Sequence, residues 1–299
     1  MRFGIYANFG RPDAAEAVNM IIDWCRKNNH ESFYCCQITN QVPPDARPLP
    51  GDDLPNRADV VISLGGDGTI LASARALKDS GVPILGINLG SLGFLTQLTP
   101  EQLECALKRL ADNDYQIEER MVLKTEVLVG EKQNLPFALN DVVIDKGNIS
   151  RVINLSLYAD GEYICSYTAD GLVISTPTGS TAYSLAVGGP ILEPCMNALI
   201  ISPISPFSLT SRPLVFPRDT VLEIRVRSPH GNAQLTIDGQ VATSFSPKGT
   251  IKVSRAEHSV KFVHFAETSF FKILRNKLHW GKLPVVDYEK SDFLKKEPE

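Results

Sequence analysis

Residues 60–69 read Val60-Val-Ile-Ser-Leu-Gly-Gly-Asp-Gly-Thr69, an apolar run that stops at two glycines, an aspartate and a third glycine. Strands covered on both faces show such continuous apolar runs, and residues 70–78 that follow are typical of a helix. In open α/β sheets, ligands bind at the carboxyl ends of strands, so this turn is a predicted ligand site. Its glycines let the backbone approach a phosphate, and a helix N-terminus favours anions.

Asp67 is the unusual residue of this turn. A carboxylate beside a phosphate site repels the ligand unless it accepts a proton or holds a metal. The turn is neither a Walker A loop, because Gly-Lys-Ser/Thr is missing, nor Gly-x-Gly-x-x-Gly. The alternative is a structural turn in which Asp67 caps the helix. Three glycines and a carboxylate that would repel a phosphate ligand, all at a strand end, favour a functional role.

The first third of the chain alternates strand-like and helix-like segments, which indicates βαβ units and a parallel sheet. A proline-rich stretch, 40–57, is predicted to be a loop. We expect strands at 2–7, 33–38, 59–64 and 83–87, and helices from Asp13 to about Lys27, from the glycine turn to about Ser80 and from Thr99 to about Asn113.

After Asn113 the segments become short, β-branched and bounded by turns, which predicts an all-β half. Asp160-Gly161 and Asp238-Gly239 indicate hairpins, and for both pairs we favour that structural role. Residues 267–279 return to helical spacing, and the polar tail from Pro284 is expected to bury little and to be dispensable. The predicted strands are 121–129, 137–145, 152–159, 162–169, 172–176, 220–227, 233–238, 249–255 and 258–265.

The composition excludes several classes of protein. The chain has 299 residues, is 43% hydrophobic and carries a net charge of −4, which argues against disorder and against a general nucleic-acid binder. No apolar stretch approaches the length of a membrane span, and the N-terminus is typical of a strand. Cysteines 25, 35, 36, 105, 165 and 195 show no C-x-x-C spacing, which indicates reduced thiols in a cytosolic protein.

Two polar stretches in the β half could bind a nucleotide. Thr176–Ser184 holds five Ser and Thr residues on a glycine-bearing turn, where hydroxyls could bind ribose or phosphate and Tyr183 could pack on a base. Asn140 and Asp141 open an apolar strand and suit a ribose diol, since one donates and accepts and the other only accepts. The alternatives are a helix-capping loop for the first and a simple turn for the second.

Two glycine-bearing turns complete the set. Gly86–Leu95 follows a second parallel strand and could form another wall of the same cleft, and Asp170-Gly171 lies between two predicted strands. The residues alone therefore indicate a two-domain cytosolic protein with a phosphate-and-ribose site led by Asp67. Phosphoryl transfer fits, because that chemistry needs positioning, a metal and a base.

These motifs, in this order, resemble the NAD kinase family over about residues 1–283. Gly-Gly-Asp-Gly-Thr alone is shared with lipid kinases of the diacylglycerol type and resembles phosphofructokinase, so the other motifs make the resemblance specific. The matching segments are Gly65–Thr69, Gly86–Leu95, Asn140-Asp141, Thr176–Ser184 with Gly188–Ile191, Ser211–Leu214 and His279–Gly281.

The resemblance implies a fold of two parts, α/β plus all-β. The first is an N-terminal Rossmann-like domain, similar to phosphofructokinase and diacylglycerol kinase, at 1–98. The second is a C-terminal β-sandwich that binds NAD, at 99–265. A helix at about 266–283 is expected to pack back on the first domain, before the polar tail at 284–299.

The resemblance also implies an activity: ATP phosphorylates the adenosine ribose 2′-hydroxyl of NAD to give NADP, with a divalent metal such as Mg²⁺. A cytoplasmic homo-oligomer, dimer or tetramer, without nucleic-acid or membrane partners is expected. The alternatives are a lipid or sugar kinase with the same glycine motif, and a non-catalytic nucleotide sensor.

The resemblance assigns the general base to Asp67 and places Gly68 beside it on the nucleotide. At position 141 the family usually carries Glu, so Asp141 is one methylene shorter. The other implied nucleotide contacts are Asn140, Asp141, Arg151, Thr168, Asp170, Thr181, Ala182, Tyr183, Ser184, Leu185, Ala186 and Gln240.

Overall fold

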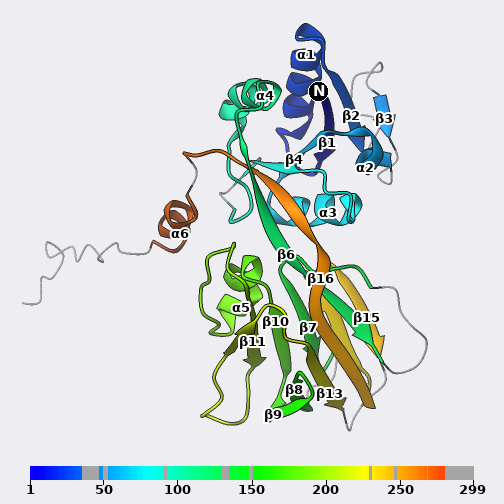
Figure 1. The fold of residues 1–299 in the computed structure, drawn as a ribbon, viewed down its shortest axis with the longest axis vertical. Coiled ribbons are helices and arrows are strands. Elements are labelled where there is room, and N and C mark those ends of the chain that lie inside the picture. Colours follow the sequence, from blue (N-terminus) through cyan, green and yellow to red (C-terminus); the bar gives the residue numbers. More distant parts are fainter. Residues whose placement is uncertain are drawn as a thin grey trace, which may run out of the picture.

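The computed structural model describes residues 1–35, 47–49, 53–90, 93–128, 135–147, 151–228, 231–245, 248–267 and 269–279. These residues form a mixed sheet and a separate antiparallel sheet. The molecule has an upper α/β half and a lower β half, and the mixed sheet extends through both (Figure 1). The fold class expected from the sequence is therefore confirmed. The predicted tail at 284–299 lies outside the described residues.

The upper half is a parallel sheet in the order β3-β2-β1-β4-β5. Buried side chains of α1 and α4 pack on one face of this sheet, and those of α2 and α3 pack on the other. The elements are β1 (Arg2–Ala7), α1 (Ala14–Lys27), β2 (Glu31–Cys35), β3 (Arg47–Leu49), α2 (Leu54–Arg57), β4 (Val60–Gly65), α3 (Asp67–Leu77), β5 (Ile84–Asn88), η2 (Pro100–Gln102) and α4 (Leu103–Ala111).

The lower half is a β-sandwich. Its second sheet is antiparallel, in the order β12-β11-β10-β7-β14-β15, and shares one apolar core with strands β8, β9, β13 and β16 of the mixed sheet. The elements are β6 (Gln116–Val127), β7 (Asp141–Asp145), β8 (Ile153–Ala159), β9 (Glu162–Ala169), β10 (Gly171–Ser175), η3 (Thr178–Thr181), α5 (Tyr183–Ala186), β11 (Ala198–Ile204), β12 (Leu214–Pro217), β13 (Leu222–Arg227), β14 (Ala233–Ile237), β15 (Val241–Phe245), β16 (Lys248–His264) and α6 (Phe270–Leu278).

Two long strands join the halves. In Figure 1, β6 and β16 run from the upper half into the lower one, and β16 pairs with β5 above and with β13 below. The sequence predicted two strands at 249–255 and 258–265, which is wrong, because β16 continues through a register shift between Arg255 and Ser259. Since the mixed sheet continues across both halves, the domain division at residues 98 and 99 stays a prediction.

Other predictions differ at particular segments. The loop predicted at 40–57 is wrong in part, because β3 adds a short strand and α2 a helical turn there, while 36–46 and 50–52 lie outside the described residues. Strands β11, β12 and β15 were not predicted. The helix expected near 267–279 is α6, whose Lys277 ammonium lies 5.3 Å from the centre of the Phe94 ring in the upper half.

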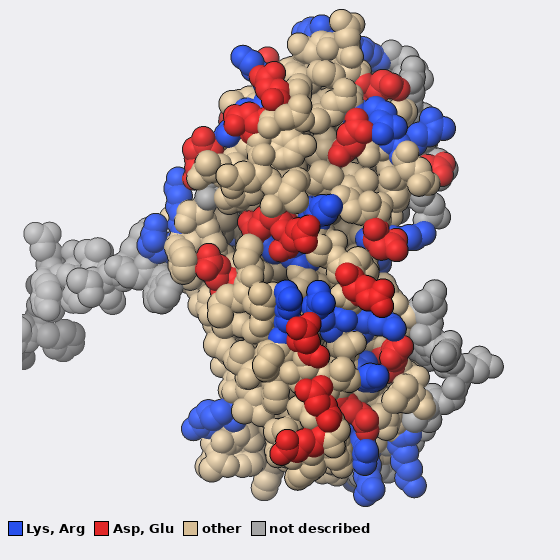
Figure 2. Space-filling view, in the orientation of Figure 1, with Lys and Arg blue, Asp and Glu red and all other residues tan. Residues whose placement is uncertain are grey.

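Surface charge and hydropathy fit the composition. Figure 2 shows acidic and basic side chains interspersed over both halves on the drawn face, as expected for a net charge of −4. Across the described residues, each helix falls short of the length and hydropathy that crossing a bilayer requires.

Candidate active site

Asp67 is the first residue of α3, and its carboxylate is held by the loop that follows β5. One oxygen, Oδ2, accepts the backbone N–H of Phe94 at 2.8 Å, and the other accepts that of Leu95 at 2.9 Å. The N-cap position belongs to Gly66, so the structural alternative in which Asp67 caps the helix is wrong. Two backbone donors instead fix the direction of this carboxylate.

Gly93 explains why the second glycine-bearing turn is needed beside Asp67. A Cβ atom added to Gly93 would lie 2.0 Å from Oδ1 of Asp67 and 2.6 Å from the Thr96 hydroxyl. Any side chain there would displace the carboxylate. The described part of Gly86–Leu95 therefore packs against the turn at Gly65–Thr69 through the Asp67 carboxylate. That it forms another wall of a ligand cleft stays a prediction.

A cavity of about 370 Å³ opens at the N-terminus of α3. It lies at the carboxyl ends of β1 and β4, where anions and nucleotides bind in sheets of this kind. Arg11 is the basic side chain among its lining residues, which suits a phosphate group. The lining residues are Tyr6, Ala7, Asn8, Phe9, Arg11, Gly66, Gly68, Thr69 and Ala72.

In the lower half, the carboxylate of Asp238 organises the segment that carries Asn140 and Asp141. It accepts three backbone N–H groups, those of Leu139 at 3.0 Å, Asn140 at 2.7 Å and Asp141 at 3.1 Å. From the opposite side, the Asn140 carbonyl accepts the N–H of Thr176 at 2.9 Å. The two polar motifs of the β half are thus fixed against each other.

A second cavity, of about 350 Å³, lies over this segment. Strand alternation places Asp141, Val143 and Asp145 on the face of β7 that lines the cavity, while Val142 and Ile144 point into the apolar core. Ala182 and Tyr183 also line this cavity. The lining residues are Asn140, Asp141, Val143, Asp145, Ala182, Tyr183, Thr236, Asp238 and Gly239.

The second cavity is acidic. Burial raises the pKa of Asp141 to about 7, the nearby Asp238 carboxylate adds to the rise, and the backbone N–H of Tyr183 opposes it. Burial, followed by the carboxylates of Asp145, Asp141 and Asp170, raises the pKa of the Tyr183 phenol. An array of acceptors suits a ligand that donates hydrogen bonds, such as a ribose diol or an exocyclic amine.

The two cavities are brought together by Gln240, which follows β14. Its side-chain Nε2 donates to the carbonyl oxygen of Gly68 at 2.9 Å, one residue from Asp67. The turn that carries Gln240 therefore connects the residue next to Asp67 to the strands that line the second, acceptor-rich cavity.

Comparison with known proteins agrees with this geometry. Residues 3–115 match the model of the ATP-NAD kinase N-terminal domain, and residues 139–265 match that of the ATP-NAD kinase C-terminal domain. The NAD kinase of Syntrophobacter fumaroxidans is 41% identical over 275 residues, which cover 91% of this chain and 96% of that protein. The chain belongs to the NAD kinase family.

Further relatives show the same family likeness over most of the chain. The NAD kinase of Trichlorobacter lovleyi is 44% identical and covers 93% of this chain and 98% of its own. Yeast NADH kinase complexed with NADH superposes with a TM-score of 0.85 at 25% identity, over 95% of this chain and 89% of its own. An Archaeoglobus fulgidus NAD kinase in complex with ATP superposes with a TM-score of 0.76 at 26% identity, over 93% of this chain and 99% of that protein.

Several contacts expected for the NAD kinase family lie at or near the second cavity. Asn140, Asp141, Ala182 and Tyr183 line it. Asp170 lies close enough for its charge to affect the Tyr183 phenol, and its carboxylate accepts Lys146 Nζ at 2.6 Å.

Other expected contacts lie elsewhere. The Ser184 hydroxyl is buried 3.3 Å from that of Ser202 on β11, so it braces α5. Thr168 is exposed on β9, where its hydroxyl donates to Asn154 at 2.9 Å. The residues that do not line the second cavity are Arg151, Thr168, Thr181, Ser184, Leu185, Ala186 and Gln240.

Asp145 and Asp238 also line the second cavity, and neither was predicted as a site residue from the sequence. Alternation along β7 could have identified Asp145, because it shares a face with Asp141. Asp238 was assigned to a hairpin. That hairpin is confirmed, with a φ of +50° at Asp238 and +64° at Gly239. The assignment was incomplete, because only the fold shows that the carboxylate reaches residues 139–141.

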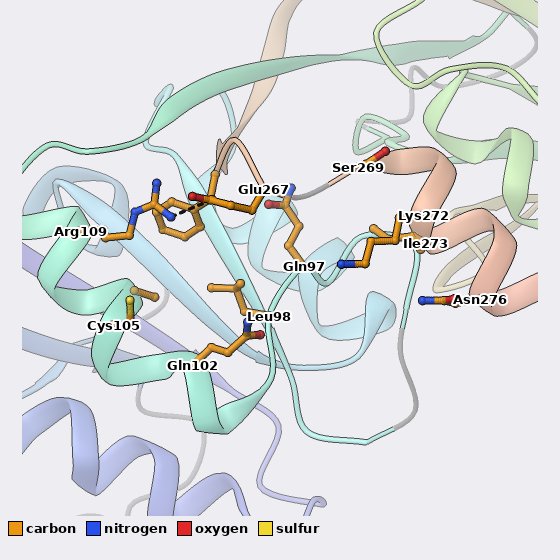
Figure 3. Close-up of a pocket in the computed structure, with 12 residues that line it drawn as sticks. Gln97, Leu98, Gln102, Cys105, Arg109, Glu267, Ser269, Lys272, Ile273 and Asn276 are labelled. Carbon is orange, nitrogen blue, oxygen red and sulfur yellow. Dashed lines mark hydrogen bonds and ion pairs between the residues drawn. The ribbon is translucent and has the colours of Figure 1, made fainter.

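A third cavity, of about 360 Å³, lies between α4 and α6 (Figure 3). The guanidinium of Arg109 donates to Glu267 at 2.9 Å and covers the Phe265 ring. The residues predicted for the nucleotide site are absent from the described lining of this cavity.

Asp141 provides a prediction about pH. Its folded pKa of about 7 lies above the ordinary 3.8, so between these values the folded state keeps a proton that the unfolded state has lost. This group therefore lowers the stability of the fold as pH rises from about 4 to about 7. Asp141→Asn should remove that loss, and its melting temperature relative to wild type should rise across this range and then level off.

Thermal unfolding of both proteins between pH 5 and pH 8 checks this, with Asp160→Asn as an exposed control. A difference in melting temperature that does not change with pH would contradict a raised pKa. A further variant, Asp141→Ala, should raise KM for NAD more than it lowers kcat in steady-state kinetics, because it removes contacts made in the ground and transition states alike. A collapse of kcat with unchanged KM would contradict this binding role.

Proposed function

We propose that this chain transfers the γ-phosphate of ATP to the 2′-hydroxyl of the adenosine ribose of NAD, which gives NADP. The observation that carries the proposal is the position of Asp67. It lies at the anion-binding end of α3, and Gln240 joins the adjacent Gly68 to the half that holds the acceptor-lined cavity. Membership of the NAD kinase family indicates ATP and NAD as the substrates, and these suit the cavity at α3 and the acceptor-lined cavity.

In the proposed mechanism, Asp67 accepts the proton of the 2′-hydroxyl as that oxygen attacks the γ-phosphorus in line. A new oxygen–phosphorus bond forms, the bond to the bridging oxygen breaks, and ADP leaves. The N–H groups of Phe94 and Leu95 hold the carboxylate in one orientation. Backbone N–H groups at the start of α3 face the transferring phosphoryl group and stabilise its charge.

We propose that ATP enters the cavity at α3 as its Mg²⁺ complex. The described residues hold no cluster of three or more His, Cys, Asp or Glu side chains suited to a metal. Mg²⁺ in nucleotide sites is usually held by substrate phosphates, waters and one or two carboxylates, so a metal that arrives with its substrate fits this residue set. It would reduce the negative charge on the phosphates.

We also propose a cytoplasmic homo-oligomer. Phe207 and Leu209 are 85% and 92% exposed in the connection between β11 and β12, and Val215 is half-exposed on β12. Strand β12 is an edge of the antiparallel sheet. Large apolar side chains beside a sheet edge favour binding to a second copy of the chain. A symmetric pair would cover the apolar side chains and the strand edge of each copy. Sedimentation velocity measures the oligomeric state directly.

A coupled assay tests the proposed reaction. The purified chain with NAD, ATP and Mg²⁺ should form NADP, detected by an NADP-specific dehydrogenase, and should form none without ATP. A nucleotide sensor would bind NAD without turnover. A lipid or sugar kinase would consume ATP with its own acceptor and leave NAD unchanged, and either result would overturn the proposal.

A further inference from the structure

The ion pair between Glu118 and Arg120 on β6 lies next to the strand that joins the two halves. Glu118 pairs in register with Phe262, the residue of β16 that also pairs with β5. Arg120 is only 8% exposed, its Nε contacts Oε1 of Glu118, and its guanidinium carbon lies 5.5 Å from the centre of the Phe262 ring. Burying two charges costs desolvation, so stability alone does not account for this pair.

This ion pair holds both ends of the segment that follows β10. At the start of the segment, Nη1 of Arg120 donates to the Thr178 hydroxyl at 3.3 Å. At its end, the Cys195 thiol donates to Oε1 of Glu118 at 3.1 Å. Residues 178–195 therefore make two side-chain contacts with one strand of the mixed sheet, although they connect β10 to β11 in the other sheet.

The turn at residues 178–183, which begins at the first of these contacts, carries predicted NAD contacts. Thr178 is buried and opens η3, and Ala182 and Tyr183 at the end of the turn line the second cavity. The Ser180 hydroxyl accepts the N–H of Leu192 at 3.1 Å, which ties the turn to the rest of the segment. Because the turn is short and hydrogen-bonded, a shift of Thr178 would displace the residues that line the cavity.

The charges around Glu118 keep the pair in one arrangement. Burial alone would raise the pKa of Glu118, but the charge of Arg120 and then the hydrogen bond from the Cys195 thiol hold that pKa below its usual value. The His264 ring on β16 lies 3.6 Å from the second carboxylate oxygen. Glu118 is therefore a carboxylate at neutral pH, and its charge fixes the guanidinium that reaches Thr178.

We infer that Arg120, held by Glu118, is a positioning residue for NAD binding. It acts through Thr178 on the turn at residues 178–183 and does not touch the substrate. Arg120 is absent from the described lining of the cavity at α3 and of the second cavity. The inference rests on the proposed binding of NAD at the second cavity.

The test compares two variants of the full chain. Thr178→Val leaves the ion pair intact, and Glu118→Gln with Arg120→Met removes both charges, so that neither is left buried alone. The matched control is Lys124→Met with Glu126→Gln, which removes an exposed pair at the same spacing on the same strand. Calorimetric titration gives the dissociation constant for NAD, and steady-state kinetics give kcat and the KM of each substrate.

Both test variants should weaken NAD binding about 10-fold, the scale of a lost hydrogen bond from a charged group. The kcat and the KM for ATP should stay within about 2-fold of wild type, since the cavity that we assign to ATP lies at α3. The control should match wild type in every measurement. Combining Thr178→Val with the Glu118 and Arg120 changes should weaken binding no further, because both remove the same contact.

Arg120→Lys separates positioning from stability. Its ammonium keeps a charge for Glu118 but lacks the guanidinium fork that also reaches Thr178. Its melting temperature should lie closer to wild type than that of the Glu118→Gln, Arg120→Met variant, with the same loss of NAD affinity. Wild-type NAD affinity in Arg120→Lys would overturn the inference.

Other outcomes would also refute the positioning role. If only Thr178→Val bound NAD weakly, its hydroxyl would be a substrate contact and Arg120 would have no part in binding. Parallel rises in KM for NAD and ATP would indicate general damage to the fold. Failure of the proposed reaction gives a different result: a wild-type chain that binds NAD but forms no NADP would refute the kinase activity, whereas the titration would still test Arg120.

Discussion

Asp67→Asn is expected to lower kcat by about 10²- to 10⁴-fold, the usual range for a lost general base. Asparagine keeps the size of the side chain but cannot accept a proton at neutral pH. NAD affinity should hold or improve, because a carboxylate near phosphates is unfavourable in the ground state. Steady-state kcat and a separate NAD binding measurement on the folded variant check both parts.

The control for Asp67→Asn concerns the loop after β5. Asparagine offers one acceptor where the carboxylate offers two, so one of the N–H groups of Phe94 and Leu95 loses its partner. Thr96→Val disturbs the same loop without touching Asp67, since it removes the buried hydrogen bond from the Gly93 N–H at 3.0 Å. If Thr96→Val lost as much kcat as Asp67→Asn, loop disturbance would explain both results and the base assignment would fail.

Gly93→Ala is expected to have the second largest effect, a loss of about 10²-fold in kcat. The added Cβ would overlap Oδ1 of Asp67 at 2.0 Å, so the carboxylate must rotate away from its two donors. NAD affinity should change little, because the cavity that we assign to the nucleoside lies in the lower half. The same kinetic and binding measurements apply.

Gly90→Ala is the matched control for Gly93→Ala. It lies in the same loop, and its added Cβ would meet Arg11 at an ordinary contact distance of 3.5 Å. Wild-type kcat in Gly93→Ala would show that the carboxylate can move without cost, which the proposed mechanism does not allow. A large loss in Gly90→Ala would instead indicate that the whole loop is intolerant of side chains.

Much of the local structure could be predicted from short stretches of sequence. The strand at Val60–Gly65 and the turn into α3 follow from an apolar run that ends in glycines, and β1 has the predicted bounds. The Asp-Gly hairpins form as expected at Asp160 and Asp238. These elements depend on the steric preferences of neighbouring residues and on alternation, which the sequence shows directly.

The continuity of β16 could not be predicted in this way. Residues 256–257 interrupt the strand pattern, and the sequence predicted a break there. In the fold, pairing with β6 on one side and with β5 and β13 on the other carries the strand through the register shift. Partners distant in sequence therefore outweighed the local preference.

The sequence by itself determined the α/β and all-β character of the two halves, the glycine-bearing turns and the family, because each is encoded in contiguous residues. Only the tertiary structure decided how the site is built. The donors to Asp67 come from residues 94 and 95, the carboxylate that holds Asn140 comes from position 238, and the raised pKa of Asp141 comes from burial. Hydrogen-bond partners and desolvation depend on which distant segments pack together, and backbone preferences within one segment do not specify that packing.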